Sequence, residues 1–365
     1  MQVSHLAFEG FRNLKTGTYE PGPGVNVIVG ENAQGKTNLL EAIWLFTGTK
    51  SFRAAKDSEL IAFGAPSSHL SLDFFAGGRP QQAEISIQTR RVATLNGIKQ
   101  SSAVKLAGVF CGIVFSPIHL SLIKDGPAER RRLIDAAFCQ LRPAYVKTLS
   151  EYVRILTQRN ALCKARDNSE AAAEMMDLWD RQLAQAGSRI LHARQRYVKQ
   201  MTPVARDIYQ GLCSGKEDFD LIYHSTIPIL PEETPAEMAV KFYQELRLHR
   251  REDLAAGFTT VGPHRDDMKV LINGCSARSF GSQGQQRSGV LAIKLAEAAL
   301  LEQVTGEKPI ALLDDVMSEL DHSRQEYILN HIQGWQVFIT CCDETPLKSL
   351  KNGQTVFVKN GELST

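Results

Sequence analysis

Eight residues at positions 30–37, Gly-Glu-Asn-Ala-Gln-Gly-Lys-Thr, have the types and spacing of a phosphate-binding loop, G-x-x-x-x-G-K-[ST]. The glycines let backbone N–H groups close around a β-phosphate, and a helix beginning at the loop adds partial positive charge. Lys36 would reach the β- and γ-phosphates, and the Thr37 hydroxyl would ligate Mg²⁺. The pattern predicts a nucleotide site, although kinases, GTPases and motor-like ATPases all use such a loop.

Two adjacent carboxylates, Asp314 and Asp315, directly follow the apolar run 310–313, as in a Walker B strand. A buried parallel strand is apolar throughout, and α/β folds hold ligands at the carboxyl ends of such strands. Asp314 would hold the Mg²⁺ shell, and Asp315 would polarise an attacking water as a general base. An acidic turn after a core strand would show the same residues, so the assignment rests on the phosphate loop in the same chain.

A third group, Ser-Gln-Gly-Gln at 282–285, stands directly before a stretch of helical periodicity that continues to 304. A serine and a glycine at a helix N-terminus form a second phosphate site, and the same residues also serve as a plain N-cap. The segment 318–321, Ser-Glu-Leu-Asp, follows the carboxylate pair and by itself reads as an acidic helix start.

The elements that must position these residues follow from the hydrophobic pattern. The loop lies between an apolar strand at 25–29 and a helical pattern at 37–44. Glycine is scarce from about 118 to 212, where apolar residues recur at helical spacing and Pro203 interrupts the last helix. Other predicted elements are strands at 3–8, 268–272, 310–313 and 337–340 and helices at 236–248, 285–304 and 323–332. The order predicts an α/β protein with an all-helical insert.

The composition is that of an ordinary globular protein of 365 residues, 43% hydrophobic and 22% charged. No apolar run approaches about 18 residues, and the N-terminus does not resemble a signal peptide, so we expect a cytoplasmic protein that has no membrane span. The seven cysteines include no C-x-x-C pair and are expected to be reduced thiols. The net charge of +2 conceals a basic segment, 124–206, with 16 Lys and Arg against 9 Asp and Glu. That segment suggests a polyanion contact, or a solvated helix face whose arginines pair with nearby acids.

The motifs and their order resemble the ABC-type ATPase heads, the group that includes the SMC proteins. Residues 282–285 are similar to the S-G-G-Q core of the ABC signature, and 318–321 resemble the D-loop. The resemblance implies a P-loop head built from both ends of the chain, 1–119 and 259–365, with an inserted helical arm at 120–258. It also implies an ATP-dependent homodimer, in which the signature of one copy covers the γ-phosphate held by the other.

Five segments, 8–14, 48–53, 126–135, 262–267 and 313–321, are similar in type and order to the RecF family. This resemblance implies an SMC-like ATPase of recombinational repair and replication restart that acts with RecO and RecR. An ATP-bound dimer would bind DNA at single-strand gaps or junctions, help to load recombinase and support SOS induction. Hydrolysis would release it, and the protein would be associated with the nucleoid.

Carried onto this chain, the resemblance assigns Lys36 and Asp315 to catalysis and Thr37 and Asp314 to Mg²⁺. Arg53 is a further phosphate ligand, although a lone arginine is more often a surface charge. The residues assigned to ATP are Gly30, Glu31, Asn32, Ala33, Gln34, Gly35, Lys36, Thr37, Asn38, Arg53, Ser282, Gly284 and Gln285.

Two departures from the ABC pattern predict slow hydrolysis, and the resemblance implies a weak, DNA-stimulated ATPase that acts as a switch. Asp315 stands where most heads have Glu, and its shorter side chain lies further from the water. The switch histidine of ABC heads, which follows a threonine, is missing here, because Thr340 is followed by Cys341.

The basic arm then suggests DNA binding that does not read sequence, since phosphate contacts are salt-dependent and sequence-neutral. Some of these side chains would instead face RecR or pair with acids inside the arm. The candidate DNA-binding residues are Arg130, Arg131, Arg132, Arg189, Arg194, Arg196 and Lys199.

Two other function classes compete with this interpretation. Another SMC-like DNA-processing ATPase, such as a nuclease subunit, would share the motifs. A P-loop kinase acting on a small molecule would need neither the segment 282–285 nor a dimer, and a GTPase would need an N-K-x-D motif, which the sequence lacks.

Overall fold

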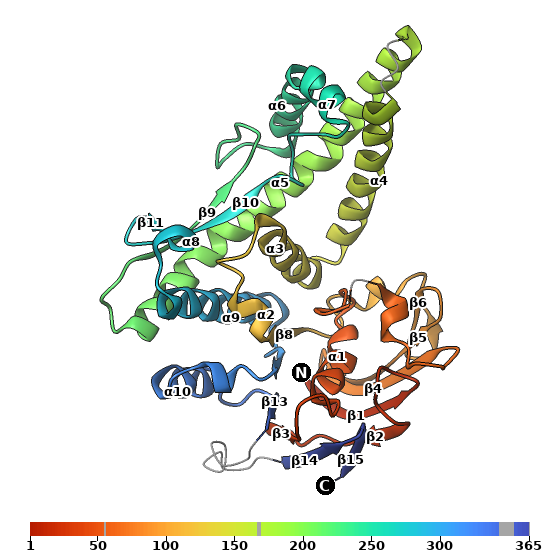
Figure 1. The fold of residues 1–365 in the computed structure, drawn as a ribbon, viewed down its shortest axis with the longest axis vertical. Helices are drawn as coiled ribbons and strands as arrows, with labels where there is room; N and C mark the ends of the chain where they lie inside the picture. Colours follow the sequence, from red (N-terminus) through yellow and green to blue (C-terminus); the bar gives the residue numbers. More distant parts are fainter. Residues whose placement is uncertain (55, 166–168, 343–353, 365) are drawn as a thin grey trace. The chain divides into compact units, whose positions relative to one another are not determined.

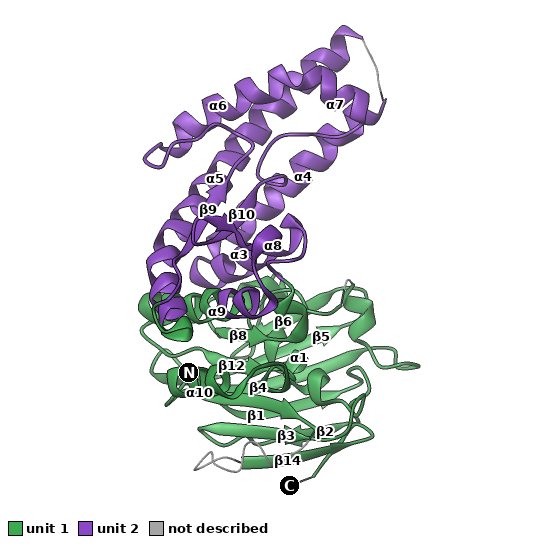
Figure 2. Ribbon diagram, turned by 60° about the vertical axis from the view of Figure 1, so that its left-hand side comes forward, with its two compact units in different colours: residues 1–121, 211–215, 290–365 green, residues 122–210, 216–289 purple. Residues whose placement is uncertain are grey.

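The computed structural model describes residues 1–54, 56–165, 169–342 and 354–364 (Figure 1). The chain divides into two units, coloured green and purple in Figure 2. Unit 1 comprises residues 1–121, 211–215 and 290–365, and unit 2 comprises 122–210 and 216–289. Among the described residues, no helix combines the length and the apolar character needed to cross a membrane.

A six-stranded sheet in unit 1 places the ends of the motif strands side by side. Its order is β15-β14-β3-β13-β12-β8, and every neighbouring pair is parallel except β14 and β15. Four of these strands are almost continuously buried, as a parallel sheet requires. The strands are β3 (Val25–Val29), β8 (Gly112–Phe115), β12 (Ile310–Leu313), β13 (Val337–Cys341), β14 (Gln354–Lys359) and β15 (Glu362–Ser364).

A second, antiparallel sheet in unit 1 has the order β2-β1-β4-β5-β6-β7. Its strands alternate between buried and exposed side chains, which is typical of a sheet with one face in a core. The strands are β1 (Gln2–Glu9), β2 (Gly17–Tyr19), β4 (Ser68–Ala76), β5 (Arg79–Ile87), β6 (Arg91–Leu95) and β7 (Ile98–Lys99).

Helix α1 (Lys36–Leu45) shares one core with both sheets. Leu39 and Ile43 belong to the same buried cluster as Leu72 of β4 and Phe338 of β13. Because α1 is buried on nearly all sides, its first turn, and with it the phosphate loop, has a fixed position. The other helices of unit 1 are η1 (Asp57–Leu60), η2 (Ala103–Leu106), α2 (Pro117–Leu120), η3 (Met317–Glu319) and α10 (His322–His331).

Unit 2 is built around the long helix α5 (Glu170–Cys213) and a small antiparallel sheet, β11-β10-β9. The predicted interruption at Pro203 is wrong, because α5 continues through that residue. The Thr202 hydroxyl donates to the Val198 carbonyl oxygen at 2.7 Å, one turn before the proline. The remaining elements are α3 (Pro127–Leu141), α4 (Ala144–Ala165), β9 (Phe219–His224), α6 (Pro235–Leu248), α7 (Arg250–Ala256), β10 (Asp267–Ile272), β11 (Cys275–Ser276) and α8 (Ala277–Phe280).

The limits of unit 2 differ from the predicted arm, 120–258. Unit 2 extends to residue 289, because β10 pairs with β9 along its full length. Helix α9 (Gln283–Thr305) begins in unit 2 and continues in unit 1. Strand pairing between distant segments, rather than composition, therefore sets this boundary.

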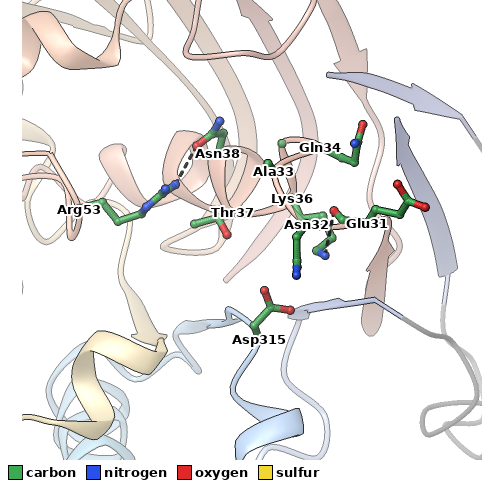
Figure 3. A pocket seen from close by; sticks show the side chains of 10 residues that line it. Glu31, Asn32, Ala33, Gln34, Lys36, Thr37, Asn38, Arg53 and Asp315 are labelled. Atoms are coloured by element: carbon green, nitrogen blue, oxygen red, sulfur yellow. Dashed lines mark hydrogen bonds between the residues drawn. The ribbon is translucent and has the colours of Figure 1, made fainter. Parts of the chain in front are cut away.

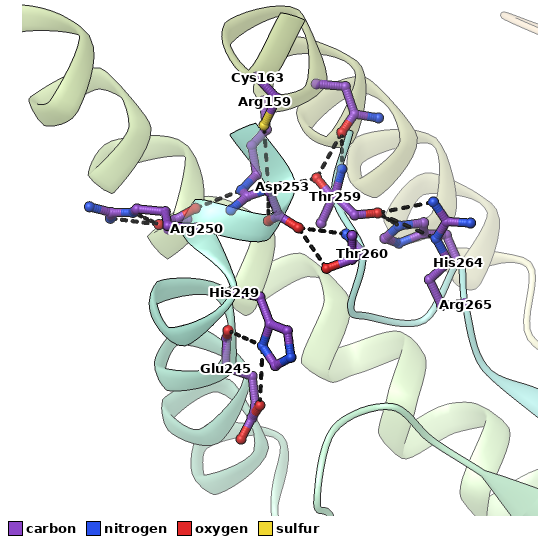
Figure 4. A network of polar contacts seen from close by, with 12 residues as sticks. Arg159, Cys163, Glu245, His249, Arg250, Asp253, Thr259, Thr260, His264 and Arg265 are labelled. Carbon is purple, nitrogen blue, oxygen red and sulfur yellow. Dashed lines mark hydrogen bonds and ion pairs between the residues drawn. The ribbon is translucent and has the colours of Figure 1, made fainter. Parts of the chain in front are cut away.

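A buried arginine joins three parts of unit 2 (Figure 4). Arg159 on α4 is fully buried, and its Nε donates to Asp180 of α5 at 2.6 Å. A second guanidinium nitrogen, Nη1, donates to Asp253 of α7 and to the Thr259 hydroxyl, both at 2.7 Å. Charges removed from water need such partners, so this network fixes α4, α5 and α7 to one another.

Replacing Arg159 by Ala should destabilise unit 2 by about 3–5 kcal/mol, because it leaves the buried Asp253 carboxylate without its cation. Urea unfolding followed by circular dichroism measures the effect. The matched control is Arg181→Ala, which removes an exposed arginine of α5 and should leave the midpoint nearly unchanged. An equal effect of both changes would contradict this assignment.

Candidate functional site

The loop 30–37 connects β3 to α1 and requires glycine at two positions. A Cβ at Gly30 would lie 2.4 Å from a carbonyl oxygen of β14, and Gly35 has a φ of 121°. The turn between β14 and β15 supports the loop, since the Gly361 N–H donates to the Gln34 carbonyl oxygen at 2.9 Å. The backbone around a phosphate position is thus held by the neighbouring strands.

Lys36 is turned inward onto the loop and is only 4% exposed. Its Nζ donates to the Gly30 carbonyl oxygen at 2.6 Å and to the Glu31 carbonyl oxygen at 3.3 Å, and it lies 3.3 Å from the Cys342 sulfur. An ammonium held by carbonyl oxygens can exchange them for phosphate oxygens without moving far.

The Asp314 carboxylate joins the ends of three neighbouring chain segments. Its Oδ1 accepts hydrogen bonds from the Thr37 hydroxyl at 2.7 Å and from the Thr340 hydroxyl at 3.1 Å. Burial and the adjacent charge of Asp315 raise the pKa of the Asp314 carboxyl, and the two hydroxyls oppose that shift. A partly desolvated carboxylate beside a threonine hydroxyl is a donor set that suits Mg²⁺, which takes few protein oxygens and shares its shell with phosphates.

Asp315 adopts a left-handed backbone conformation, with a φ of 51°. Its N–H donates to the Thr340 hydroxyl at 2.8 Å, so one threonine holds both carboxylate residues. Figure 3 shows the Asp315 carboxylate facing the side of the loop that carries Asn32 and Lys36. Strain of this kind persists where the surrounding contacts enforce it, commonly at functional sites. Sequence reasoning did not identify Thr340 as a site residue, although it noted the position.

A row of amides connects the loop to Arg53. The Asn13 side chain donates to the Ala33 carbonyl oxygen at 3.0 Å and accepts from the Asn38 amide at 2.6 Å. Arg53 in turn donates to Asn38 at 2.9 Å (Figure 3). Asn13 was also missed, and the only signal for it was the similarity of segment 8–14 to the RecF family.

The residue before it, Arg12, anchors the same segment to α1. Arg12 donates through two nitrogens to the Glu41 carboxylate, at 2.9 and 3.0 Å, and Glu41 is fully buried. Ser51 donates to Glu41 as well, while its hydroxyl accepts from the Arg53 N–H at 2.9 Å. The buried carboxylate therefore orders both segments that reach the loop.

The structure brings most of the predicted nucleotide residues into one pocket of unit 1 (Figure 3). Gly30 and Asp314 do not line this pocket but contact residues that do, since Gly30 accepts from Lys36 and Asp314 accepts from Thr37. The pocket is lined by Glu31, Asn32, Ala33, Gln34, Gly35, Lys36, Thr37, Asn38, Arg53 and Asp315. The predicted residues Ser282, Gly284 and Gln285 belong to unit 2.

Residues 282–285, the signature segment, form the first turn of α9. The Ser282 N–H donates to the Gln285 side-chain oxygen at 2.8 Å, and the Ser282 hydroxyl accepts from the Gln285 N–H at 3.2 Å. This reciprocal pair is a capping box, so the N-cap interpretation is correct for the isolated chain. Ser282 is exposed, and its hydroxyl, which accepts one hydrogen bond, can also donate one.

The predicted DNA-binding residues separate into buried and exposed groups. Arg130 and Arg194 are each 3% exposed and bind Asp267 and Asp135, respectively, with two nitrogens. Their assignment to a DNA-binding surface is therefore wrong: these guanidinium groups already fill buried ion pairs. Arg131 is half-buried and donates to the Asp266 carbonyl oxygen. Exposed side chains remain at Arg132, Arg189, Arg196 and Lys199, of which Arg132 and Lys199 pair with Glu129 and Glu232.

The sequence matches the family described as RecF/RecN/SMC N terminal domain over residues 2–365. The DNA replication and repair protein RecF of Acetivibrio thermocellus is 35% identical to it over 361 residues, 98% of each chain. The chain belongs to the RecF family. A RecF of Heliobacterium modesticaldum is 40% identical over 344 residues, which cover 93% of this chain and 92% of that relative.

Solved structures agree with membership of the RecF family. The recombination mediator protein RecF-ATP of the RecFOR pathway superimposes with a TM-score of 0.92 at 34% identity, covering 100% of this chain and 97% of that one. The Smc head domain of Pyrococcus furiosus with an extended coiled coil, at 15% identity, has a TM-score of 0.56 and covers 100% of this chain and 95% of that one. The predicted ABC-type head fold is confirmed.

Replacing Asp314 by Asn should stabilise the ligand-free protein at neutral pH. Because the pKa of this carboxyl is raised, its contribution to stability is complete at low pH and is lost as the pH rises above ~4, the ordinary value for Asp. An amide carries no charge to desolvate, so the variant avoids that loss. We expect its Tm at pH 8 to exceed that of the wild type by about 2–4 °C, or ~1 kcal/mol.

Melting curves between pH 4 and pH 8 measure this difference, which should shrink toward pH 4. The control is Asp207→Asn, an exposed position on α5. A lower Tm for Asp314→Asn across the whole range would show that the charged form of Asp314 stabilises the fold.

Proposed function

We propose that this protein is an ATP-dependent DNA-binding protein of recombinational repair and replication restart, acting in the cytoplasm. The observation that carries the proposal is the 2.7 Å contact between Thr37 and Asp314, which joins the phosphate loop to the carboxylate pair. Relatives of the RecF family that span nearly the whole chain, one of them solved as RecF-ATP in the RecFOR pathway, support the same conclusion. RecO and RecR are the corresponding partners, and loading of recombinase at single-strand gaps, with support of SOS induction, is the corresponding role.

The site residues have separate roles in this proposal. The loop N–H groups and Lys36 bind the β- and γ-phosphates, while Thr37 and Asp314 hold Mg²⁺, which neutralises charge on the phosphates when bound. Asp315 orients the attacking water and accepts its proton as the water oxygen bonds to the γ-phosphorus and ADP leaves. A carboxylate on a short side chain reaches the water poorly, so hydrolysis is slow and serves as a switch.

The signature segment supplies the second half of the site from another copy of the chain. Ser282 and Gly284 would contact the γ-phosphate bound by the partner, and Gln285 would keep the first turn of α9 in shape. ATP then closes a homodimer on DNA, and hydrolysis opens it. The exposed hydroxyl of Ser282 and the capping box around it support this role.

The exposed basic side chains of α5 give the best candidate DNA surface. Arg189 and Arg196 are seven residues apart, two helical turns, and therefore lie on one face, and Lys199 is one turn further along. Side chains at this spacing can follow a phosphate backbone without reading bases.

Sedimentation with and without ATP and Mg²⁺ tests the proposed dimer. The wild type should change from monomer to dimer, and Ser282→Arg should bind ATP normally but stay monomeric, because the new side chain blocks the partner's phosphate. Asp315→Asn should form the dimer and hydrolyse ATP about 100-fold more slowly, the contribution of a general base. A wild type that binds ATP as a monomer, as a small-molecule kinase would, refutes the dimer.

Binding to gapped, single-stranded and duplex DNA tests the surface on α5. Replacing Arg189 and Arg196 by Gln should weaken binding to unrelated sequences alike and reduce the slope of log Kd against log salt by about 1 for each residue. Arg181→Gln changes an exposed arginine of α5 that already pairs with Asp177, and should have a smaller effect. Equal effects of the two sets would place the DNA elsewhere.

A further inference from the structure

Gln285 of the signature segment is held at both ends of its side-chain amide. The amide oxygen accepts from the Ser282 N–H at 2.8 Å, and the amide nitrogen donates to Glu217 Oε1 at 2.7 Å. An amide has one acceptor end and one donor end, so these two bonds fix its orientation. The position of Ser282 therefore depends on where the Glu217 carboxylate lies.

Glu217 is in turn held by the end of α5. The Tyr209 hydroxyl donates to Glu217 Oε2 at 2.7 Å, on the oxygen that Gln285 does not use. The Tyr209 ring stacks on Phe219, the first residue of β9, with ring centres 4.6 Å apart. Hydrogen bonds to a carboxylate are stronger than neutral ones, so the connection Tyr209–Glu217–Gln285–Ser282 is well suited to transmit a displacement.

The same helix carries the exposed basic residues. At 1.5 Å per residue, Lys199 lies about 15 Å and Arg189 about 30 Å along α5 from Tyr209. The helix is continuous through Pro203, and Tyr209 is buried against β9, so a shift of the basic segment moves the tyrosine with it.

We propose that Glu217 is a positioning residue that couples a polyanion bound along α5 to the signature serine, Ser282. The inference rests on the proposed function, in which Ser282 meets the partner's γ-phosphate. Displacement of α5 by bound DNA moves the Glu217 carboxylate through Tyr209, and Gln285 then shifts the Ser282 N–H and hydroxyl. Since coupling between two binding sites is reciprocal, closure of the ATP dimer changes DNA affinity by the same factor.

The test compares Glu217→Ala and Tyr209→Phe with the matched control Glu245→Ala, a half-buried glutamate on α6 that pairs with His249. The main measurement is the ratio of DNA affinities with and without ATP, at one salt concentration, using a single-stranded oligonucleotide. Loss of one charge-assisted hydrogen bond predicts about a tenfold fall in this ratio for Glu217→Ala. Tyr209→Phe keeps the ring stack and should lower the ratio about fivefold, and the control should keep the wild-type value.

Three further readouts distinguish coupling from a structural role. Both variants should keep the wild-type Tm, the wild-type Kd for ATP in the monomer and the wild-type Kd for DNA without nucleotide. A variant that keeps the wild-type ratio, or that changes these single-ligand constants by as much as the ratio, overturns the inference while the dimer of the wild type stands. If Glu217→Ala does not fold, Tyr209→Phe alone decides. A wild type with no ATP-dependent dimer refutes the proposed function and this inference together.

Discussion

The Oδ1 atom of Asp314 accepts hydrogen bonds from Thr37 and Thr340, and these three residues end or follow three neighbouring strands. Parallel strands have their carboxyl ends at one edge of the sheet, so residues 277 positions apart in sequence meet within 2.7 Å. The strand order β3-β13-β12 is thus the constraint on which the site depends. An order that placed β3 and β12 further apart would separate the phosphate loop from the carboxylate pair.

Several features of the site lower the local stability of the fold. The well-packed core around the site offsets this loss. Three such features lie at one edge of the parallel sheet. The Asp314 carboxyl has a raised pKa, the Lys36 side chain is turned inward, and Asp315 has a left-handed backbone conformation. Around them, α1 shares a buried core with two sheets, and the Arg12–Glu41 ion pair ties the segment that follows β1 to that helix. Strain at a functional edge that is supported by a well-packed core is the usual distribution in enzymes.

The basic segment shows why a count of charges does not define a surface. Arg130 and Arg194 looked equivalent to their neighbours in sequence, yet each pairs with an aspartate 137 or 59 residues away. Arg189 and Arg196 lie on an exposed face of α5. Which arginines remain available for a polyanion depends on tertiary partners that no local pattern contains.

The sequence by itself determined the features that are local: the loop 30–37, the strand at 310–313 and the α/β order, because their signals lie in spacing and periodicity. The tertiary structure decided what depends on neighbours. Asn13 and Thr340 reach the site only through the sheet order, and the extent of unit 2 depends on the pairing of β9 with β10. Likewise, Glu217 meets Gln285 across 68 residues. Hydrogen bonds between distant segments leave no periodic pattern in the sequence. These partners can therefore be identified only from the tertiary structure.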